Sequence, residues 1–174
     1  KAAAEIGDEG IRMYLGCELH SSMDMTDCLK KGERLTMAGS RYVLVEFRTT
    51  DEKSYIRERV QALIRRGYYP IIAHVERYRS VVKGGLDFID ELRDMGAYIQ
   101  MNADSIIGGD GFMIKRFCKK VIKEEMLDFV GSDGHDMAKR TPHIGKCYDK
   151  IEKMMGTDYA DMIFISNPEC IIHN

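Results

Sequence analysis

The sequence predicts an α/β protein in which a parallel sheet is covered by helices. Two observations lead to this prediction. Short apolar runs rich in β-branched and aromatic residues recur along the chain, and stretches with the period of an amphipathic helix separate them. Repeated strand–helix units of this kind form a parallel sheet that is either open or closed into a barrel. Periodicity alone does not separate the open sheet from the barrel.

The strands and helices can be placed in order along the chain. Five short apolar segments are typical of buried strands, namely Ile11–Leu19, Tyr42–Phe47, Pro70–His74, Ala97–Met101 and Leu127–Val130. Four segments have helical periodicity, namely Tyr55–Arg66, Leu86–Met95, Met113–Glu125 and Ile144–Met155. Gly67 and Gly96 stand where two of these helices would end. Asn167 and Pro168 predict the cap and first turn of a closing segment.

The first ten residues predict the end of a helix and not the start of a strand–helix unit. Lys1–Gly10 resembles the tail of a helix that leads into the first strand, and no methionine precedes it. We therefore expect the chain to start inside a strand–helix unit. Residues 1–174 are interpreted as a single domain that lacks its N-terminal part.

Composition narrows the class of protein. Of the 174 residues, 44% are hydrophobic and 31% are charged, which is typical of a soluble globular domain. A formal net charge of −2 gives no basic surface for nucleic acid or an anionic membrane. No apolar run approaches the roughly 20 residues of a membrane span, so we expect no membrane-embedded part. Five scattered cysteines without a CxxC pair indicate reduced thiols and a cytoplasmic protein.

Acidic and histidine side chains fall at the ends of successive predicted strands. Glu18, Glu46 and His74 end or nearly end the first three strands, and Asp133 and His135 follow the fifth. The carboxyl ends of parallel strands meet at one rim, where α/β proteins place their chemistry. Each residue alone is more often a solvated or core side chain. Together they predict a mixed oxygen and nitrogen site suited to Mn, Fe or Zn.

Two arginines extend this predicted site. Arg77 follows His74 by three residues, and Arg140 follows His135 by five. Guanidinium groups bind two phosphate oxygens at once, so a metal cluster flanked by arginines favours a phosphoester substrate over an amide. The commoner fate of a loop arginine is exposure to solvent, and this alternative stays open from the residues alone.

Several segments together resemble one protein family. GCELH, RYVLVEF, PIIAHVERY, GSDGHD and NPECII occur in the order and at about the spacings of bacterial PHP-type (polymerase and histidinol phosphatase) tyrosine phosphatases of capsular and exopolysaccharide synthesis. The resemblance runs from about Ile11 to Ile172, and its IAHxERY and SDxH segments are the most specific. It implies a distorted TIM-like (β/α)7 barrel of the PHP type, with the first strands missing from this chain.

The resemblance also implies a function. Such proteins are manganese-dependent hydrolases that hold up to three divalent metals and dephosphorylate the tyrosine-rich tail of a bacterial tyrosine kinase. Carried onto this sequence, Glu18 bridges two metals, and Glu46 and His74 complete the second metal. Asp133 binds the first metal and His135 the third, while arginines at two positions hold the substrate phosphate, Arg77 and Arg140. A homo-oligomer is compatible with the resemblance.

The chain departs from the family pattern at its start. The family opens with an Asp-x-His-x-His strand and has a further metal-binding histidine downstream, whereas the first histidine here is His20. We therefore expect the second metal to bind best. His20 stands where relatives carry tyrosine, and on a regular strand it would face the same way as Glu18. This orientation would allow His20 to act as an extra ligand, although a substrate-side or solvated role is expected for it.

Three alternatives to this interpretation can be stated. Cys28–Arg34 matches the C-x5-R pattern of cysteine-dependent phosphatases, but no buried strand precedes it and Glu33 would lie beside the phosphate. We therefore reject that chemistry. Another PHP-type metallohydrolase acting on a small phosphoester such as histidinol phosphate, or on an amide, remains possible from sequence. So does a non-catalytic remnant that only binds a partner.

Overall fold

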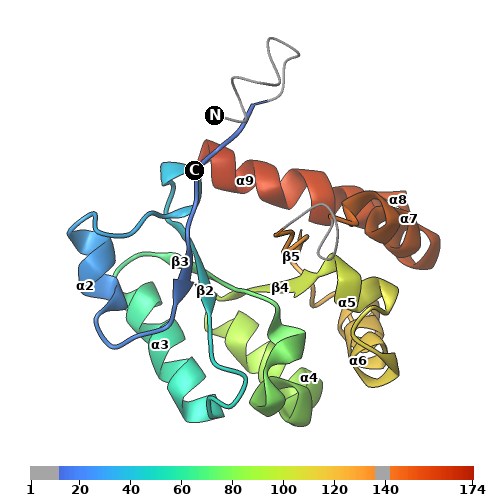
Figure 1. Cartoon of the computed structure of the whole chain (residues 1–174), viewed down its shortest axis with the longest axis horizontal. Coiled ribbons are helices and arrows are strands. Elements are labelled where there is room, and N and C mark those ends of the chain that lie inside the picture. Colours follow the sequence, from blue (N-terminus) through green and yellow to red (C-terminus); the bar gives the residue numbers. More distant parts are fainter. Residues whose placement is uncertain (1–11, 136–141) are drawn as a thin grey trace.

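The computed structural model describes residues 12–135 and 142–174. Within these ranges the strands form one parallel sheet in the order β1-β2-β3-β4-β5, so neighbours in the sequence are neighbours in the sheet (Figure 1). Their bounds are β1 Glu18–His20, β2 Tyr42–Glu46, β3 Tyr69–Ile72, β4 Tyr98–Asn102 and β5 Phe129–Gly131. The prediction of an α/β protein with a parallel sheet is confirmed.

Helices connect the strands and then continue beyond the last one. The α-helices are α2 Met25–Lys30, α3 Lys53–Arg65, α4 Arg79–Asp94, α5 Ala103–Ile107, α6 Phe112–Lys123, α7 Ile144–Met155, α8 Thr157–Asp161 and α9 Asn167–His173. Two 3₁₀ turns, η1 Met37–Gly39 and η2 Val75–Arg77, and one π-helical turn, η3 Met162–Ser166, complete the described elements. No helix in the described ranges is both long and apolar enough to cross a membrane.

One face of the sheet carries the main hydrophobic core. Successive strand residues point to opposite faces, and Val43, Val45 and Ile72 point towards the helices that cover this face. They pack with Ile56 of α3 and Phe88 of α4, all of them at most 1% exposed. Burying these side chains supplies the hydrophobic free energy of the fold, at about 25 cal/mol per Å² of apolar surface.

The opposite face is divided between apolar and polar residues. Near the start of the strands, Tyr42, Ile71 and Phe129 form a smaller cluster with Tyr98, and Ile171 of α9 packs against it. Towards the ends of the strands the same face turns polar. The side chains there are Glu18, His20, Glu46, Gln100 and Asn102, the first three of them on the two neighbouring strands β1 and β2.

The structure differs from the sequence prediction in two respects. The sheet is open among the described residues, with β1 and β5 at its edges, and closure into a barrel is not observed. The first strand spans Glu18–His20 instead of Ile11–Leu19, of which residue 11 lies outside the described ranges. Residues 12–17 do not join the sheet: the carbonyl of Leu15 accepts the N–H of Ala38 in η1.

Candidate metal centre

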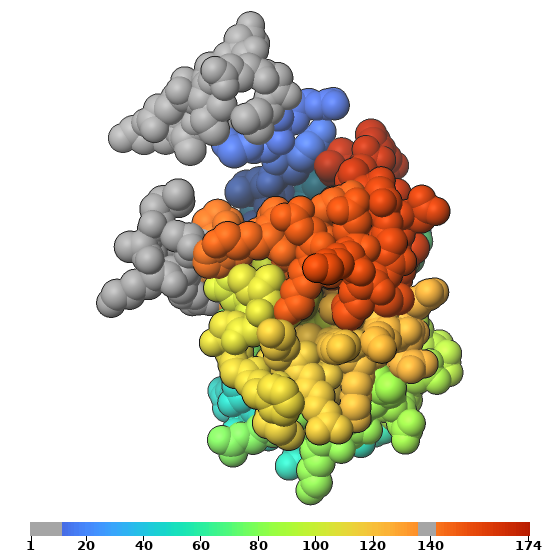
Figure 2. Space-filling model, turned by 90° about the vertical axis from the view of Figure 1, so that its right-hand side faces the viewer, coloured from blue at the N-terminus to red at the C-terminus, as the bar shows by residue number. Residues whose placement is uncertain are grey.

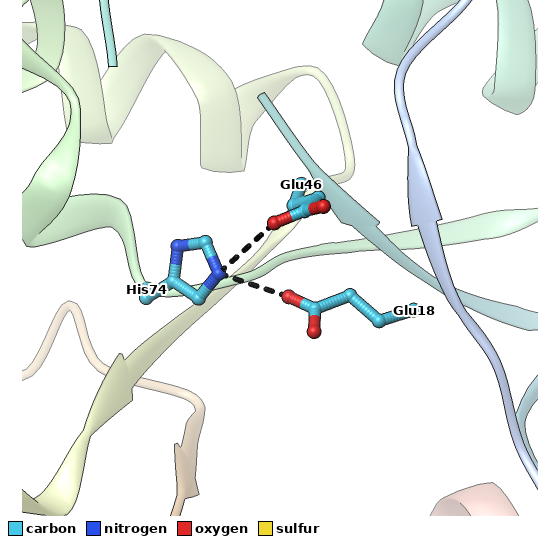
Figure 3. A group of neighbouring side chains, drawn as sticks. All are labelled: Glu18, Glu46 and His74. Carbon is cyan, nitrogen blue, oxygen red and sulfur yellow. Dashed lines mark hydrogen bonds and ion pairs between the residues drawn. The ribbon is translucent and has the colours of Figure 1, made fainter. Parts of the chain in front are cut away.

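Three side chains meet at the polar rim of the sheet. Glu18 begins β1, Glu46 ends β2, and His74 follows β3 by two residues. Nε2 of His74 lies 2.9 Å from Oε1 of Glu18 and 3.6 Å from Oε2 of Glu46. Figure 3 shows that the two carboxylates approach this one ring nitrogen from separate strands. The three residues define the candidate metal centre.

His74 is aimed at the carboxylates by an unusual backbone. Its φ of 33° and ψ of 54° are left-handed, a conformation that costs a non-glycine residue roughly 1–2 kcal/mol. The N–H of His74 donates to Oε1 of Gln100 over 2.6 Å, and its carbonyl accepts the N–H of Arg77 over 2.9 Å. These bonds hold the tight turn that ends β3 and opens η2. The side chain of His74 is 8% exposed, so surrounding protein atoms limit its movement.

The other ring nitrogen of His74 also has a partner. Nδ1 lies 3.2 Å from the hydroxyl oxygen of Tyr78, which accepts the N–H of Phe47 over 3.0 Å. Tyr78 is fully buried, and burial raises the pKa of its phenol, so the group stays protonated. A protein partner on the nitrogen that faces away from the metal is the usual arrangement around metal-binding histidines.

The donor set of the candidate metal centre fits a divalent metal ion. Each of the three residues offers one ligand atom, and these atoms lie within 4.8 Å of one another. Ligands bound to a divalent transition metal at about 2.0–2.2 Å are spaced about 3 Å apart, close to the separations seen here. Two carboxylates and one imidazole form a mixed oxygen and nitrogen set, which suits Mn, Fe and Zn.

Asp133 lies beside this centre in a polar network. One of its carboxylate oxygens, Oδ2, lies 2.7 Å from the guanidinium of Arg77 and accepts the amide N–H of Asn102 over 3.1 Å. Asn102 in turn accepts a hydrogen bond from Gln100, whose Oε1 holds the backbone of His74. The side chain of Asp133 is 12% exposed. A chain of directed hydrogen bonds therefore links two of the predicted ligands, His74 and Asp133.

Glu76 anchors the same turn from the inside. It is 1% exposed, and its Oε1 accepts the backbone N–H of Asn102 and the hydroxyl of Ser105. Burial raises the pKa of this carboxyl, while the Ser105 hydrogen bond acts in the opposite direction. Glu76 therefore ties η2 to the start of α5. Arg77, the next residue, is thereby held at the rim.

The structure places the other predicted site residues as follows. The His135 side chain is 58% exposed, and its Nδ1 lies 2.9 Å from the Asp133 carbonyl instead of joining the centre. Arg140 lies outside the described residues. His20 faces the same way as Glu18, as expected, and its Nδ1 lies 3.4 Å from Oε1 of Glu46. Three of the five predicted ligands are thus brought together.

The C-x5-R segment has the wrong geometry for a nucleophilic loop. Cys28 lies within the short helix α2, and its Sγ is 3.8 Å from a carboxylate oxygen of Asp24. Partial burial, a hydrogen bond with Glu33 and the charge of Asp24 raise the pKa of the thiol. A thiol with a raised pKa is a poor nucleophile. This supports the rejection of cysteine chemistry.

Sequence reasoning did not identify three residues that support the centre. Gln100 and Asn102 are polar residues at alternate positions of the buried strand β4, a pattern that could have marked them. Tyr78 ends the IAHxERY segment of the family resemblance, but nothing in the sequence distinguished its contact with His74 from ordinary packing of a core tyrosine.

The fold and the centre together define a class: an α/β protein with a metal-ligand cluster and an arginine at the carboxyl ends of its parallel strands. Within this class, the model of the family "Capsular polysaccharide synthesis, CpsB/CapC" matches residues 1–173. The chain therefore belongs to the CpsB/CapC family, which confirms the resemblance seen in the sequence.

Curated relatives and a solved structure agree with this assignment. The tyrosine-protein phosphatase CpsB of Streptococcus pneumoniae is 30% identical over 175 residues, which cover 98% of this chain and 71% of the relative. The tyrosine-protein phosphatase YwqE of Bacillus subtilis is 27% identical over 167 residues, 96% of this chain and 65% of the relative. A chain from crystal structures of YwqE and CpsB, described as unique metal-dependent tyrosine phosphatases, superposes with a TM-score of 0.89. That chain is 25% identical, and the match covers 99% of this chain and 69% of the other.

Proposed function

We propose that this protein is a metal-dependent protein tyrosine phosphatase that uses the candidate metal centre to hydrolyse phosphotyrosine. The observation that carries the proposal is the convergence of Glu18 and Glu46 on Nε2 of His74. The family and the names of its relatives supply the reaction class. We further propose manganese as the metal, with Fe or Zn as alternatives, and Asp133 and His135 as further ligands.

The charge of the rim explains why the reaction needs a metal. A hollow of about 440 Å³ lies beside the centre and is lined by Arg77, Asn102, Asp104, Gly109, Asp110, Ser132 and Asp133. Several carboxylates face one arginine there, so a phosphate monoester would be repelled. A bound divalent ion neutralises this charge, stabilises charge on the phosphoryl oxygens and lowers the pKa of water. The rim is therefore electrostatically complementary to a phosphate only when a cation is present.

The residues of the chain have separate roles in this proposal. His74, Glu18 and Glu46 would hold the ion, and the turn of η2 presents the Arg77 guanidinium to the substrate phosphate. Arg140, which lies outside the described residues, is proposed to bind the same phosphate. A guanidinium binds two equatorial oxygens at once and stabilises the charge that they gain during transfer. The leaving phenolate of tyrosine is stable enough that protonation by a general acid matters less than for an alkyl ester.

The family supports a proposal for the substrate and the setting of the reaction. We propose that the substrate is the phosphotyrosine tail of a bacterial tyrosine kinase that controls capsular or exopolysaccharide synthesis. All five cysteines are unpaired thiols, which supports a reducing, cytoplasmic location. The sequential strand order supports the PHP barrel, because a doubly wound sheet would reverse its order at a switch point.

Metal analysis combined with hydrolysis tests the proposal. The purified protein, equilibrated with manganese, should retain the ion after desalting and hydrolyse a phosphotyrosine peptide faster than histidinol phosphate. A chelator should abolish turnover. His74→Ala should remove both bound metal and turnover, whereas Cys28→Ser should retain both. Chelator-resistant turnover that is lost in Cys28→Ser would overturn the proposal, and a preference for the alkyl phosphate would assign the centre to another PHP-type hydrolase.

A further inference from the structure

A second hollow lies apart from the candidate metal centre. It has a volume of about 260 Å³, and its apolar lining is formed by Ile106 of α5, Ile122 of α6 and Met154 of α7. Four lysines complete the lining: Lys115 and Lys119 from α6, and Lys150 and Lys153 from α7. We call this set of seven side chains the lysine groove. Figure 2 views this side of the molecule, with α7 in orange above the yellow and amber of α5 and α6.

Within residues 12–135 and 142–174, the four ammonium groups of the lysine groove form no ion pair with a carboxylate. The Lys150 ammonium is instead held by a hydrogen bond to the carbonyl of Ile106. Partial burial and then the charge of Lys115 lower the pKa of Lys150. Like charges held this close favour the binding of an anion.

The apolar surface extends beyond the hollow along α6. Phe112 is 74% exposed and stands three and seven residues before Lys115 and Lys119, so the three side chains share one side of the helix. Phe112 therefore adds exposed apolar surface beside Lys115 and Lys119. The groove and its extension therefore offer contacts for both apolar and acidic groups.

One loop joins the lysine groove to the proposed active site. The side chain of Lys115 passes close to Gly108, where an added Cβ would lie 3.0 Å from its Cδ. The next two residues, Gly109 and Asp110, line the hollow beside the metal centre. A peptide bound in the groove would therefore lie one short loop away from the site where phosphate is proposed to bind.

We propose that the lysine groove binds an acidic peptide segment anchored by one large apolar or aromatic side chain. This inference rests on the proposed phosphatase function, since the segment would belong to the same polypeptide as the phosphotyrosine. Pockets for small molecules usually measure about 300–1,000 Å³, so a hollow of this size suits a single side chain better than a free cofactor. A membrane would press on a flat surface and leave the hollow unfilled, which favours a peptide over a lipid surface.

Binding to a peptide that cannot react tests the inference separately from catalysis. The probe is a fluorescent peptide in which phenylalanine is flanked by glutamates, followed by anisotropy. The double variant Lys115→Gln/Lys119→Gln should bind it about fivefold to tenfold more weakly than the wild type, and salt should weaken wild-type binding. Lys120→Gln/Lys123→Gln is the matched control, because it removes the same charge from α6 outside the groove. It should bind within about twofold of the wild type. Thermal unfolding of both variants checks that each is folded.

Kinetics with two substrates separate this inference from the proposed function. For an acidic phosphotyrosine peptide, KM should rise in Lys115→Gln/Lys119→Gln while kcat stays constant. For a small aryl phosphate, both constants should stay unchanged. Equal peptide binding by the two double variants would overturn the inference, and so would binding to phosphatidylglycerol vesicles in preference to the peptide. If the wild type hydrolysed neither substrate, the proposed phosphatase function would be refuted. The test of peptide binding would still stand, because it does not depend on turnover.

Discussion

The hydroxyl oxygen of Tyr78 lies 3.2 Å from Nδ1 of His74, on the side of the ring away from the two carboxylates. The same oxygen accepts the N–H of Phe47, so its position is fixed from two directions. Tyr78 is fully buried, and water is not available to replace it. The buried residues Phe47 and Tyr78 are therefore connected through this hydroxyl to the imidazole of the candidate metal centre.

Removing this hydroxyl should weaken metal binding. In Tyr78→Phe, Nδ1 of His74 and the N–H of Phe47 lose their partner, and the ring is less firmly oriented. Loss of such a partner typically costs about 10–100-fold in metal affinity. Isothermal titration with manganese measures the change.

Tyr55→Phe is the matched control for this variant. Tyr55 and Tyr78 both pack edge-on against the ring of Phe47. Within the described ranges, the hydroxyl of Tyr55 donates to the carbonyl of Ser21 over 3.4 Å and forms no hydrogen bond with His74. Its removal should leave manganese affinity unchanged, and an equal loss in both variants would show that ring packing, not the hydroxyl, orients His74.

A single methyl group at Gly131 should disturb the hydrogen-bond chain on β4. An added Cβ would lie 2.3 Å from Nε2 of Gln100, so Gly131→Ala forces that side chain to move. Gln100 then loses its bonds to the amide of His74 and to Asn102. We expect the free energy of unfolding to fall by about 1–3 kcal/mol, measured by urea denaturation, and manganese affinity to fall with it.

Gly145→Ala provides the comparison for Gly131→Ala. Gly145 lies in the first turn of α7, and an added Cβ there meets no atom within 4 Å. Alanine favours a helix over glycine, so stability should stay constant or rise by up to about 1 kcal/mol. A similar loss of stability in both variants would contradict the proposed clash.

Replacing Asp128 should change how stability depends on pH. Burial raises the pKa of this carboxyl, although it accepts the N–H of Ile99 and faces Arg93. The folded state therefore keeps its proton to a higher pH than the unfolded state does. As pH rises from about 4 through the raised pKa, this group makes the wild type progressively less stable.

Asp128→Asn lacks this titration and should lose that part of the pH dependence. The free energy of unfolding of the variant, relative to the wild type, should rise between pH 4 and 7 in urea denaturation. Asp87→Asn, at an exposed position of α4, should follow the wild type throughout. A constant difference between Asp128→Asn and the wild type would show that burial does not perturb this carboxyl.

Arg77 should contribute to turnover more than to metal binding. In Arg77→Gln, the proposed phosphate loses a bidentate partner, and kcat on a phosphotyrosine peptide should fall by about 100-fold. Manganese content, measured by elemental analysis, should be retained because Arg77 is not a ligand. Arg79→Gln, two residues later in α4, should keep full activity. Equal losses in the two variants would remove Arg77 from the proposed phosphate site.

Much of the fold could be predicted because its strands are short and apolar. Tyr42–Phe47 and Ala97–Met101 match β2 and β4 to within one residue. The first strand was predicted too long, since apolar residues alone do not reveal whether a partner strand is present. Of the residues from 12 onwards that the structure describes before α2, three, Glu18–His20, pair with β2. The predicted barrel stays a prediction. Its closure depends on pairing between distant segments, which the apolar pattern of each strand does not reveal.

Three ligands of the candidate metal centre could be predicted, but the hydrogen bonds that orient them could not. Glu46 and His74 were found because parallel strands bring their carboxyl ends to one rim. Glu18 was predicted at the end of a longer first strand; it begins the short β1 instead and reaches the same rim because it pairs beside Leu44 of β2. The left-handed turn at His74 and its bond to Gln100 depend on residues 26 positions apart, which no local pattern encodes. His135 was predicted from its place after the fifth strand, yet its side chain lies exposed, in a loop where Asp133 has a positive φ of 48°.

The alternation of the strand residues also protects the centre against misalignment. In β2, Val43 and Val45 face the helices while Leu44 and Glu46 face the other side. A slip of one residue between β2 and its neighbours would drive Glu46 into the hydrophobic core and turn valines towards the metal. The cost of burying that carboxylate excludes the slipped pairing. The apolar face that stabilises the domain therefore also fixes the register that places Glu46 at the metal centre.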